Sequence, residues 1–302
     1  MADMVRAALC ALLAALGLGA PRCEAPGLTG CTQALEISSP GSVTDPALTE
    51  ISGIAAGRRN PDGWWVHNDS GDSARVFALG PEGATRRVYT VSEAAARDWE
   101  DLALGPGPRK GVDYLYLADI GDNRVERDEV VVYRVPEPDV TTGPDPLALD
   151  DVSALHLRYP DGPRDAETLL VDPRTGDLFI VGKRYQGGAV HVFRAPPDLA
   201  AGSVTTLTDA GTVVLPEGVP NAITGGDVSV DGRQVVLRTY GTVRLFERRR
   251  NQTIPEALAG ASCLGLSPEE RQGEAIAFDP DGRGYVTIGE GEGRALNHIS
   301  PR

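Results

Sequence analysis

The sequence predicts an all-β protein that forms a single β-propeller, with five blades as the simplest count. Its 36 Gly and 23 Pro are spread along all 302 residues, as in a turn-rich β protein. A short motif that opens a hydrophobic strand also recurs at intervals of roughly 45 to 65 residues, a period typical of propeller blades. The five copies are Glu50-Ile51-Ser52-Gly53-Ile54, Asp98-Trp99-Glu100-Asp101-Leu102, Asp165-Ala166-Glu167-Thr168-Leu169, Gly225-Gly226-Asp227-Val228-Ser229 and Gly273-Glu274-Ala275-Ile276-Ala277.

Each copy starts a run of predicted strands that forms one blade. Turn signals such as Asn60-Pro61-Asp62-Gly63 separate the strands. The interval from Leu102 to Leu169 is long enough to hold further strands, so six blades stays an open alternative. We also expect one helical turn at 267–270. The predicted strands are 52–55, 64–67, 75–79 and 86–90; 99–102, 114–118, 130–135 and 154–159; 167–170, 178–181, 189–193 and 211–215; 227–230, 235–238 and 243–246; and 274–278 and 284–288.

The N-terminal part of the chain divides into three segments. Residues 1–25 are expected to be a signal peptide, because the apolar run after Arg6 is too short to span a bilayer. Residues 26–33 would be a short linker, and residues 34–302 the propeller domain. Within that domain, residues 34–38 alternate like a strand, and we expect them to complete the last blade and close the ring.

Export predicts a secreted or cell-envelope protein and an oxidising compartment for its cysteines. Leu28-Thr29-Gly30-Cys31 reads as a lipobox, which would place a lipid anchor on Cys31. Alternatively, Cys31 could form a disulfide with Cys263 and fasten the ring, or Cys263 could simply be buried. The net charge of −14 opposes nucleic acid and anionic membranes, so we expect no nucleic-acid partner. We expect a monomer.

Propeller topology brings the starts of the innermost strands together around one mouth of the central axis. Like charges so close together need a cation, or some of them must keep their protons. A ring of oxygen ligands suits Ca²⁺ as the cofactor. The alternative is that these carboxylates only accept hydrogen bonds from neighbouring blades. The predicted metal ligands are Glu50 (or Ser52 in its place), Glu100, Glu167, Asp227 and Glu274.

The ends of the second strands should reach the same mouth, and they carry many polar residues. Acidic and amide groups gather on blades one, two and five, whereas cations and phenols gather on blades three and four. Such a funnel could hold a metal on one side and an anionic group on the other. The predicted ligand-binding residues are Asn68, Asp69, Asp119, Asp122, Asn123, Lys183, Arg184, Arg238, Tyr240 and Glu290.

Two further assignments in this region stay open. The segments 69–72 and 119–123 resemble short Ca²⁺ loops, but Asp, Asn and Gly are equally favoured in Asx turns. His67 is the candidate general base, with Glu100 as a second catalytic candidate. A structural histidine is the alternative for His67.

The chain resembles a family of secreted bacterial β-propeller proteins that have no established activity. The resemblance implies the propeller fold and an exported location, and it spans roughly residues 31–292. More remotely, the chain is similar to SdiA-regulated propellers, calcium-activated nucleotidases and the gluconolactonase group. These similarities imply a metal at the axis, held by Glu50, Glu100, Glu167, Asp227 and Glu274. The motifs that carry the resemblance are Glu50-Ile51-Ser52-Gly53-Ile54, 67–72, 99–103, 119–123, 159–162, 165–167 and 273–277.

Two functions follow from the sequence. The first is an exported propeller whose acidic, Ca²⁺-binding funnel binds a small molecule, a glycan or a protein. The alternative is a metal-assisted hydrolase of an anionic ester, either a phosphoester or a lactone, in which Lys183, Arg184 or Arg238 holds the anion. The two differ in whether His67 and Glu100 are needed for turnover.

Overall fold

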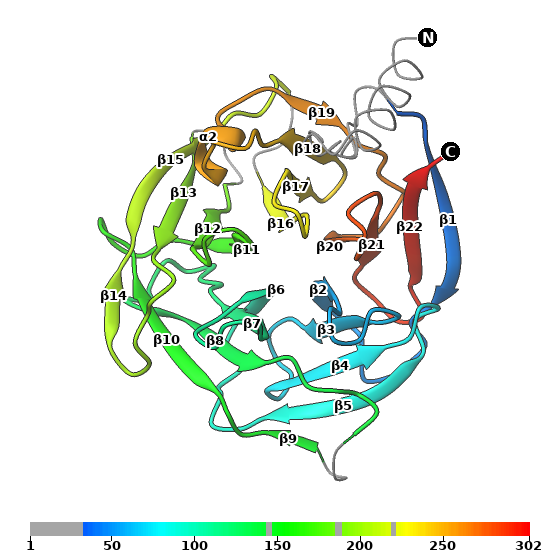
Figure 1. Ribbon diagram of the computed structural model, residues 1–302, viewed down its shortest axis with the longest axis horizontal. Helices are drawn as coiled ribbons and strands as arrows, with labels where there is room; N and C mark the ends of the chain where they lie inside the picture. Colours follow the sequence, from blue (N-terminus) through cyan, green and yellow to red (C-terminus); the bar gives the residue numbers. More distant parts are fainter. Residues whose placement is uncertain (1–32, 143–146, 185–188, 219–221) are drawn as a thin grey trace, which may run out of the picture.

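The computed structural model describes residues 33–142, 147–184, 189–218 and 222–302. Five sheets in these residues are arranged as blades in a ring (Figure 1), which confirms the predicted five-bladed β-propeller. The helix expected at 267–270 is absent from the described residues. A short helix, α2 (Ile254–Leu258), forms instead behind a capping box of Thr253 and Glu256. No helix in the described ranges has the length and apolar character needed to cross a membrane.

Each blade runs outward from a central strand. Blade 1 contains β2 (Ile51–Ala56), β3 (Trp64–Asn68), β4 (Arg75–Leu79), β5 (Thr85–Val91) and β9 (Leu147–Leu149); blade 2 contains β6 (Trp99–Pro106), β7 (Asp113–Asp119), β8 (Val130–Pro136), β10 (Ser153–Arg158) and β14 (Val204–Thr206); blade 3 contains β11 (Ala166–Val171), β12 (Leu178–Gly182), β13 (Val190–Ala195) and β15 (Thr208–Val213); blade 4 contains β16 (Ile223–Val228), β17 (Gln234–Thr239), β18 (Val243–Glu247) and β19 (Ser262–Leu264); and blade 5 contains β20 (Gly273–Phe278), β21 (Tyr285–Gly289), β22 (Ala295–Pro301) and β1 (Leu35–Ser42).

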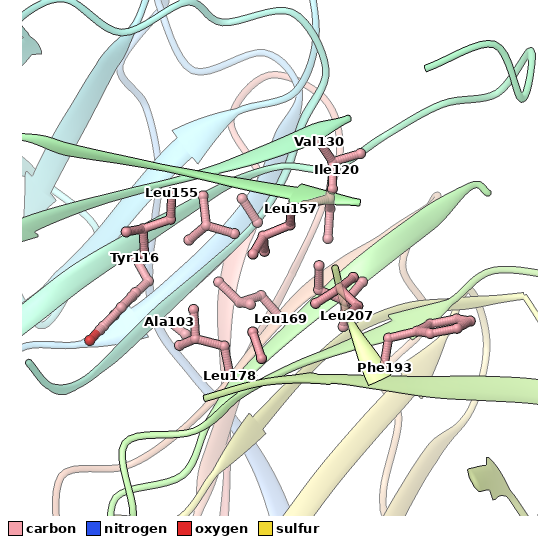
Figure 2. Close-up of a cluster of buried hydrophobic side chains, with 14 of the residues drawn as sticks. Ala103, Tyr116, Ile120, Val130, Leu155, Leu157, Leu169, Leu178, Phe193 and Leu207 are labelled. Atoms are coloured by element: carbon pink, nitrogen blue, oxygen red, sulfur yellow. The ribbon is translucent and has the colours of Figure 1, made fainter. Parts of the chain in front are cut away.

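Hydrophobic side chains fill the space between neighbouring blades. Figure 2 shows the cluster between blades 2 and 3, where Ala103, Tyr116 and Leu155 from blade 2 pack with Leu169 and Phe193 from blade 3. All five are at most 3% exposed. Because a blade is covered on both faces, its inner strands read as nearly continuous apolar runs. This packing fixes the inner strands around the axis.

The first strand closes the ring, as predicted. β1 pairs antiparallel with β22 at the outer edge of blade 5, with Leu35 opposite Pro301 and Ser42 opposite Ala295. The N-terminal strand therefore belongs to the same blade as the C-terminal one. Cys263, in β19, is disulfide-bonded. Its predicted partner Cys31, like the signal peptide, lies outside the described residues.

Two outer strands join the blade that precedes them in the ring. β9 leaves the connection between β8 and β10 and pairs in parallel with β5 of blade 1. β14 leaves the connection between β13 and β15 and pairs in parallel with β10 of blade 2. β9 accounts for part of the long interval between Leu102 and Leu169 that had left a sixth blade open.

Candidate metal site at the mouth of the central axis

A β-bulge re-aims one residue near the start of every inner strand. In each blade, the pairing between the first and second strands skips one residue on the first strand only. Bulges of this kind leave the extra residue unpaired and turn its side chain to a new direction. The five bulge residues therefore form an equivalent set around the axis. They are Ser52, Glu100, Glu167, Thr224 and Glu274.

Three of the predicted metal ligands occupy this ring, and two do not. Glu100, Glu167 and Glu274 lie at bulge positions. Ser52 takes the position in blade 1, and Glu50 is exposed just before β2. Thr224 takes the position in blade 4, and its hydroxyl donates to Gly273 O at 2.8 Å.

Asp227 is a hydrogen-bond acceptor between blades instead. Its carboxylate accepts from Val228 N at 2.7 Å and from Phe278 N in β20 at 2.8 Å. Asp101 links blades 2 and 3 in the same way, because it accepts from Leu102 N and Leu169 N at 2.8 Å each. Asp227 therefore accepts hydrogen bonds between blades 4 and 5, which is the alternative to metal binding that the sequence left open.

A three-carboxylate group lies between blades 1 and 2 and includes Glu100 of the ring. Asp69, Asp98 and Glu100 each place one oxygen so that the three oxygens lie within 4.8 Å of one another. Asp69 directly follows β3, and Asp98 directly precedes β6. The backbone of Gly121 approaches this group closely: a Cβ at that position would lie 2.2 Å from Glu100 Oε1 and 2.5 Å from Asp98 Oδ2.

Burial and mutual repulsion oppose ionisation of these carboxyls. Burial raises the pKa of Glu100 well above its ordinary value, and the charges of Asp69 and Asp98 raise it further. Burial likewise raises the pKa of Asp69 to about 6, with Asp98 contributing. The pKa of Asp98 is also raised, mainly by burial. A cation between the three groups would reverse these penalties, because an opposite charge favours the ionised form.

Glu274 and Glu290 extend the acidic region from blade 5. Burial raises the pKa of Glu274 far above its ordinary value, and the charge and hydrogen bond of Glu290 raise it further. Glu274 Oε2, Glu167 Oε2 and Ser52 Oγ are buried without a hydrogen-bond partner in the described part of the chain. Unpaired buried oxygens are costly, and a cation would satisfy them. The donor set therefore fits a hard metal ion such as Ca²⁺. Below, the acidic centre means Asp69, Asp98, Glu100, Glu167, Glu274 and Glu290.

No family model matches the chain, and no curated protein matches it.

Lys183 supplies a buried positive charge to the acidic centre. Its Nζ forms an ion pair with Glu167 Oε1, and the two side chains are only 3% and 5% exposed. The Lys183 ammonium also lies 5.3 Å from the centroid of the Tyr240 ring. The sequence places both residues correctly at the ends of the second strands, in blades 3 and 4. Arg184, the next residue, is exposed.

The segment after β7 is organised by Arg127. Its Nη1 donates to Asp119 Oδ1 at 2.8 Å and to Gly121 O at 2.7 Å. Asp119 Oδ1 also accepts from Asp98 N at 3.2 Å. Asp122 accepts from the backbone of Glu126 and Arg127, so both of its carboxylate oxygens are used within this loop. Asn123 is exposed on this loop.

His67 and Asn68 end β3 and directly precede Asp69 of the acidic centre. His67 is 0% exposed, its ring packs edge-on against Trp99 at 5.3 Å, and its Nδ1 lies 2.8 Å from Asn68 O. Burial lowers the pKa of His67. Asn68 Nδ2 donates to Ala47 O and to Asp72 at 2.7 Å each. The Asn68 side chain is thus committed to local contacts, whereas His67 Nε2 is buried without a hydrogen-bond partner in the described residues.

Arg238 is likewise committed to the scaffold. It is 0% exposed, its Nη2 pairs with Glu270 Oε2 at 2.8 Å, and its Nη1 donates to Ala275 O at 2.9 Å. A Cβ on Gly273 would lie 1.7 Å from Arg238 Nη2, so this glycine makes room for the guanidinium. Arg238 therefore joins blades 4 and 5.

Sequence reasoning did not assign a role to Asp98, although Asp98 opens the motif that defines the repeat. The strand-start argument selects residues inside the strand, whereas Asp98 lies just before β6. A signal for it was nevertheless present: Asp98 is two residues before Glu100, and such spacing in an extended segment places both side chains on one face.

Proposed function

We propose that this β-propeller binds one Ca²⁺ ion through Asp69, Asp98 and Glu100 and presents it at the mouth of its axis. The observation that carries the proposal is the close approach of three carboxylate oxygens, within 4.8 Å of one another, in a partly buried place. The nearby cations are engaged elsewhere, because Arg127 pairs with Asp119 and Lys183 pairs with Glu167. A bound divalent ion would neutralise the repulsion between the three groups.

Calcium is the ion that the donor chemistry favours. The group consists of carboxylates alone, which suit hard cations, and Ca²⁺ tolerates irregular geometry better than Mg²⁺ does. Asp69 and Asp98 are only partly buried, so the ion would keep coordination positions open toward solvent. Those positions could accept oxygen atoms of an external ligand.

Binding of a ligand, rather than turnover, is the role that we propose for this ion. The predicted general base, His67, is 0% exposed, so it offers no accessible surface to a ligand. The proposal is therefore an exported binding propeller for a small molecule, a glycan or a protein. A screen of phosphoesters and lactones with and without Ca²⁺ tests the hydrolase alternative, and Ca²⁺-dependent turnover of any of them would replace the binding role.

The metal site is tested by elemental mass spectrometry and by melting curves in EDTA and in CaCl₂. We expect one Ca²⁺ per chain and a melting temperature that rises with Ca²⁺ concentration, because a ligand of the folded state stabilises it. The variant E100Q should bind no Ca²⁺ and should lose this shift. A matched control is E82Q, which changes an exposed carboxylate between β4 and β5. An absence of metal and of any shift in the unmodified protein would overturn the proposal.

A further inference from the structure

The position of Lys183 divides the acidic centre into a blade 3 part, which is Glu167, and a part formed by the carboxylates of blades 1, 2 and 5. Glu167 stands at the blade 3 bulge, equivalent to Glu100 in blade 2 and Glu274 in blade 5. Lys183 directly follows β12, the strand that pairs with β11, and its backbone N–H donates to Asp165 O at 3.0 Å. The same blade therefore supplies both a ring carboxylate and the ammonium that neutralises it.

The ammonium is held from more than one side. It pairs with Glu167 Oε1 and faces the ring of Tyr240 in blade 4 at 5.3 Å. A cation over an aromatic face is stabilised by the ring quadrupole, more so where water is excluded. The charge of Lys183 also favours the ionised forms of Glu100 and Glu274, so its field reaches the carboxylates of blades 2 and 5.

An oxygen atom remains unsatisfied beside this ion pair. Glu167 is 4% exposed, and its Oε2 has no hydrogen-bond partner among the described residues. A carboxylate can bind a metal through either oxygen or both. In blade 3, Glu167 thus provides a buried carboxylate of the kind that binds a metal ion, and the Lys183 ammonium occupies the place of that ion.

We infer that the Lys183 ammonium fills a second cation position of the acidic centre, so that the centre accepts a single divalent ion, displaced from the axis toward Asp69, Asp98 and Glu100. This inference rests on the proposed calcium site. Repulsion from the fixed ammonium also weakens the binding of the neighbouring Ca²⁺. Lys183 is therefore a residue that determines the stoichiometry and affinity of the metal site.

The test is a titration of the full chain with CaCl₂, by calorimetry and elemental analysis. We expect K183M to bind either a second Ca²⁺ or one Ca²⁺ at least about tenfold more tightly than the unmodified protein. R184M is the matched control, because it removes the same charge from the exposed neighbour and should change neither quantity. The double variant K183M/E167Q should return to one Ca²⁺, because the second carboxylate is gone.

The outcomes separate the two proposals. If the unmodified protein binds one Ca²⁺ and folded K183M behaves in the same way, the inference about Lys183 fails while the calcium site stands. If the unmodified protein binds none and K183M binds one, the calcium site of the unmodified protein fails, and only the occupation of a cation position by the Lys183 ammonium stands. Should K183M fail to fold, E167Q decides: releasing the ammonium from its partner should weaken Ca²⁺ binding at least about threefold, and an unchanged affinity would refute the inference.

Discussion

Gly121 shows how a single backbone position can shape the metal site. Its lack of a side chain lets the loop after β7 approach Glu100 Oε1 and Asp98 Oδ2, where a Cβ would stand 2.2 and 2.5 Å away. We expect G121A to push both carboxylates apart and to lower the Ca²⁺ affinity at least about tenfold, because metal sites need their ligands held in place. Calorimetric titration measures this effect.

A matched control for that substitution is available in blade 4. Gly241 has no heavy atom within 4 Å of a Cβ built on it, so G241A should leave Ca²⁺ affinity unchanged. Equal affinities of the G121A variant and the control would show that the close approach of Gly121 does not position the ligands.

The raised pKa values of the acidic carboxyls predict how stability depends on pH in EDTA. The pKa of Asp69 rises from 3.8 to about 6 on folding, and that of Glu274 rises far above 4.5. A group whose folded-state pKa is raised binds its proton more tightly in the folded state, so its contribution to stability is present at low pH and is lost as pH rises through the folded-state pKa. The free energy of unfolding should therefore fall between about pH 4 and pH 6 through Asp69, and further above that range through Glu274.

Urea denaturation in EDTA at about pH 5 and about pH 8 measures this slope. Saturating Ca²⁺ should flatten the slope, because the cation favours the ionised forms. E274Q should reduce the part above about pH 6, since glutamine does not titrate, and should leave the contribution of Glu100. A slope that is identical in the unmodified protein and in E274Q would exclude Glu274 as its source.

At the scale of the element, the inner strands are joined to one another through buried carboxylates. Asp227 accepts hydrogen bonds from β16 and β20, so D227A would leave the N–H groups of Val228 and Phe278 without this partner. We expect a loss of about 1 to 3 kcal/mol in the free energy of unfolding, measured by urea denaturation, because unsatisfied buried donors are costly. Calcium stoichiometry should stay at one per chain. Loss of metal with unchanged stability would restore Asp227 as a ligand.

The hairpins could be predicted from sequence, whereas the bulges could not be read directly. Turn residues and apolar runs mark the strands, and β1 was recognised because it precedes the first repeat. A bulge shifts the direction of side chains by one residue without any change in strand composition. For this reason Asp227 was placed on the ring. An alignment of Ile223-Thr224-Gly225 with Ile51-Ser52-Gly53 would have selected Thr224.

The hydrogen-bond and ion-pair partners of individual side chains could not be predicted from the sequence either. Pairing of Lys183 with Glu167, and of Arg238 with Glu270, depends on contacts between elements that are distant along the chain. From the sequence, Lys183 and Arg238 could both be placed at the ends of second strands. Only tertiary packing shows that the Lys183 ammonium lies in the acidic centre, whereas the Arg238 guanidinium joins two blades. The three-residue strands β9 and β14 carry too little pattern to be recognised.

For the whole molecule, closure of the ring depends on β1. Removal of residues 1–42 would expose the edge of β22, which β1 covers along its length. We expect this truncation to lower the melting temperature and to promote association, because open strand edges pair with other chains. Differential scanning calorimetry and size-exclusion chromatography measure the two effects. A truncated chain that stays monomeric with an unchanged melting temperature would show that blade 5 closes without β1.

β9 extends from the blade 2 segment onto blade 1, and β14 extends from the blade 3 segment onto blade 2, so both overlaps run in the same direction around the ring. Blade 2 cannot detach without uncovering blade 1, and blade 3 cannot detach without uncovering blade 2. Blade 3 is covered in the same sense by α2, which leaves the connection between β18 and β19 of blade 4: Val214 N donates to Leu258 O at 3.0 Å, and Arg248 pairs with Asp172 at 2.8 Å. Blade 5 carries β1, which leads into blade 1. The junction between blades 4 and 5 has no such outer overlap in the described residues, so under mechanical load the ring should part there first.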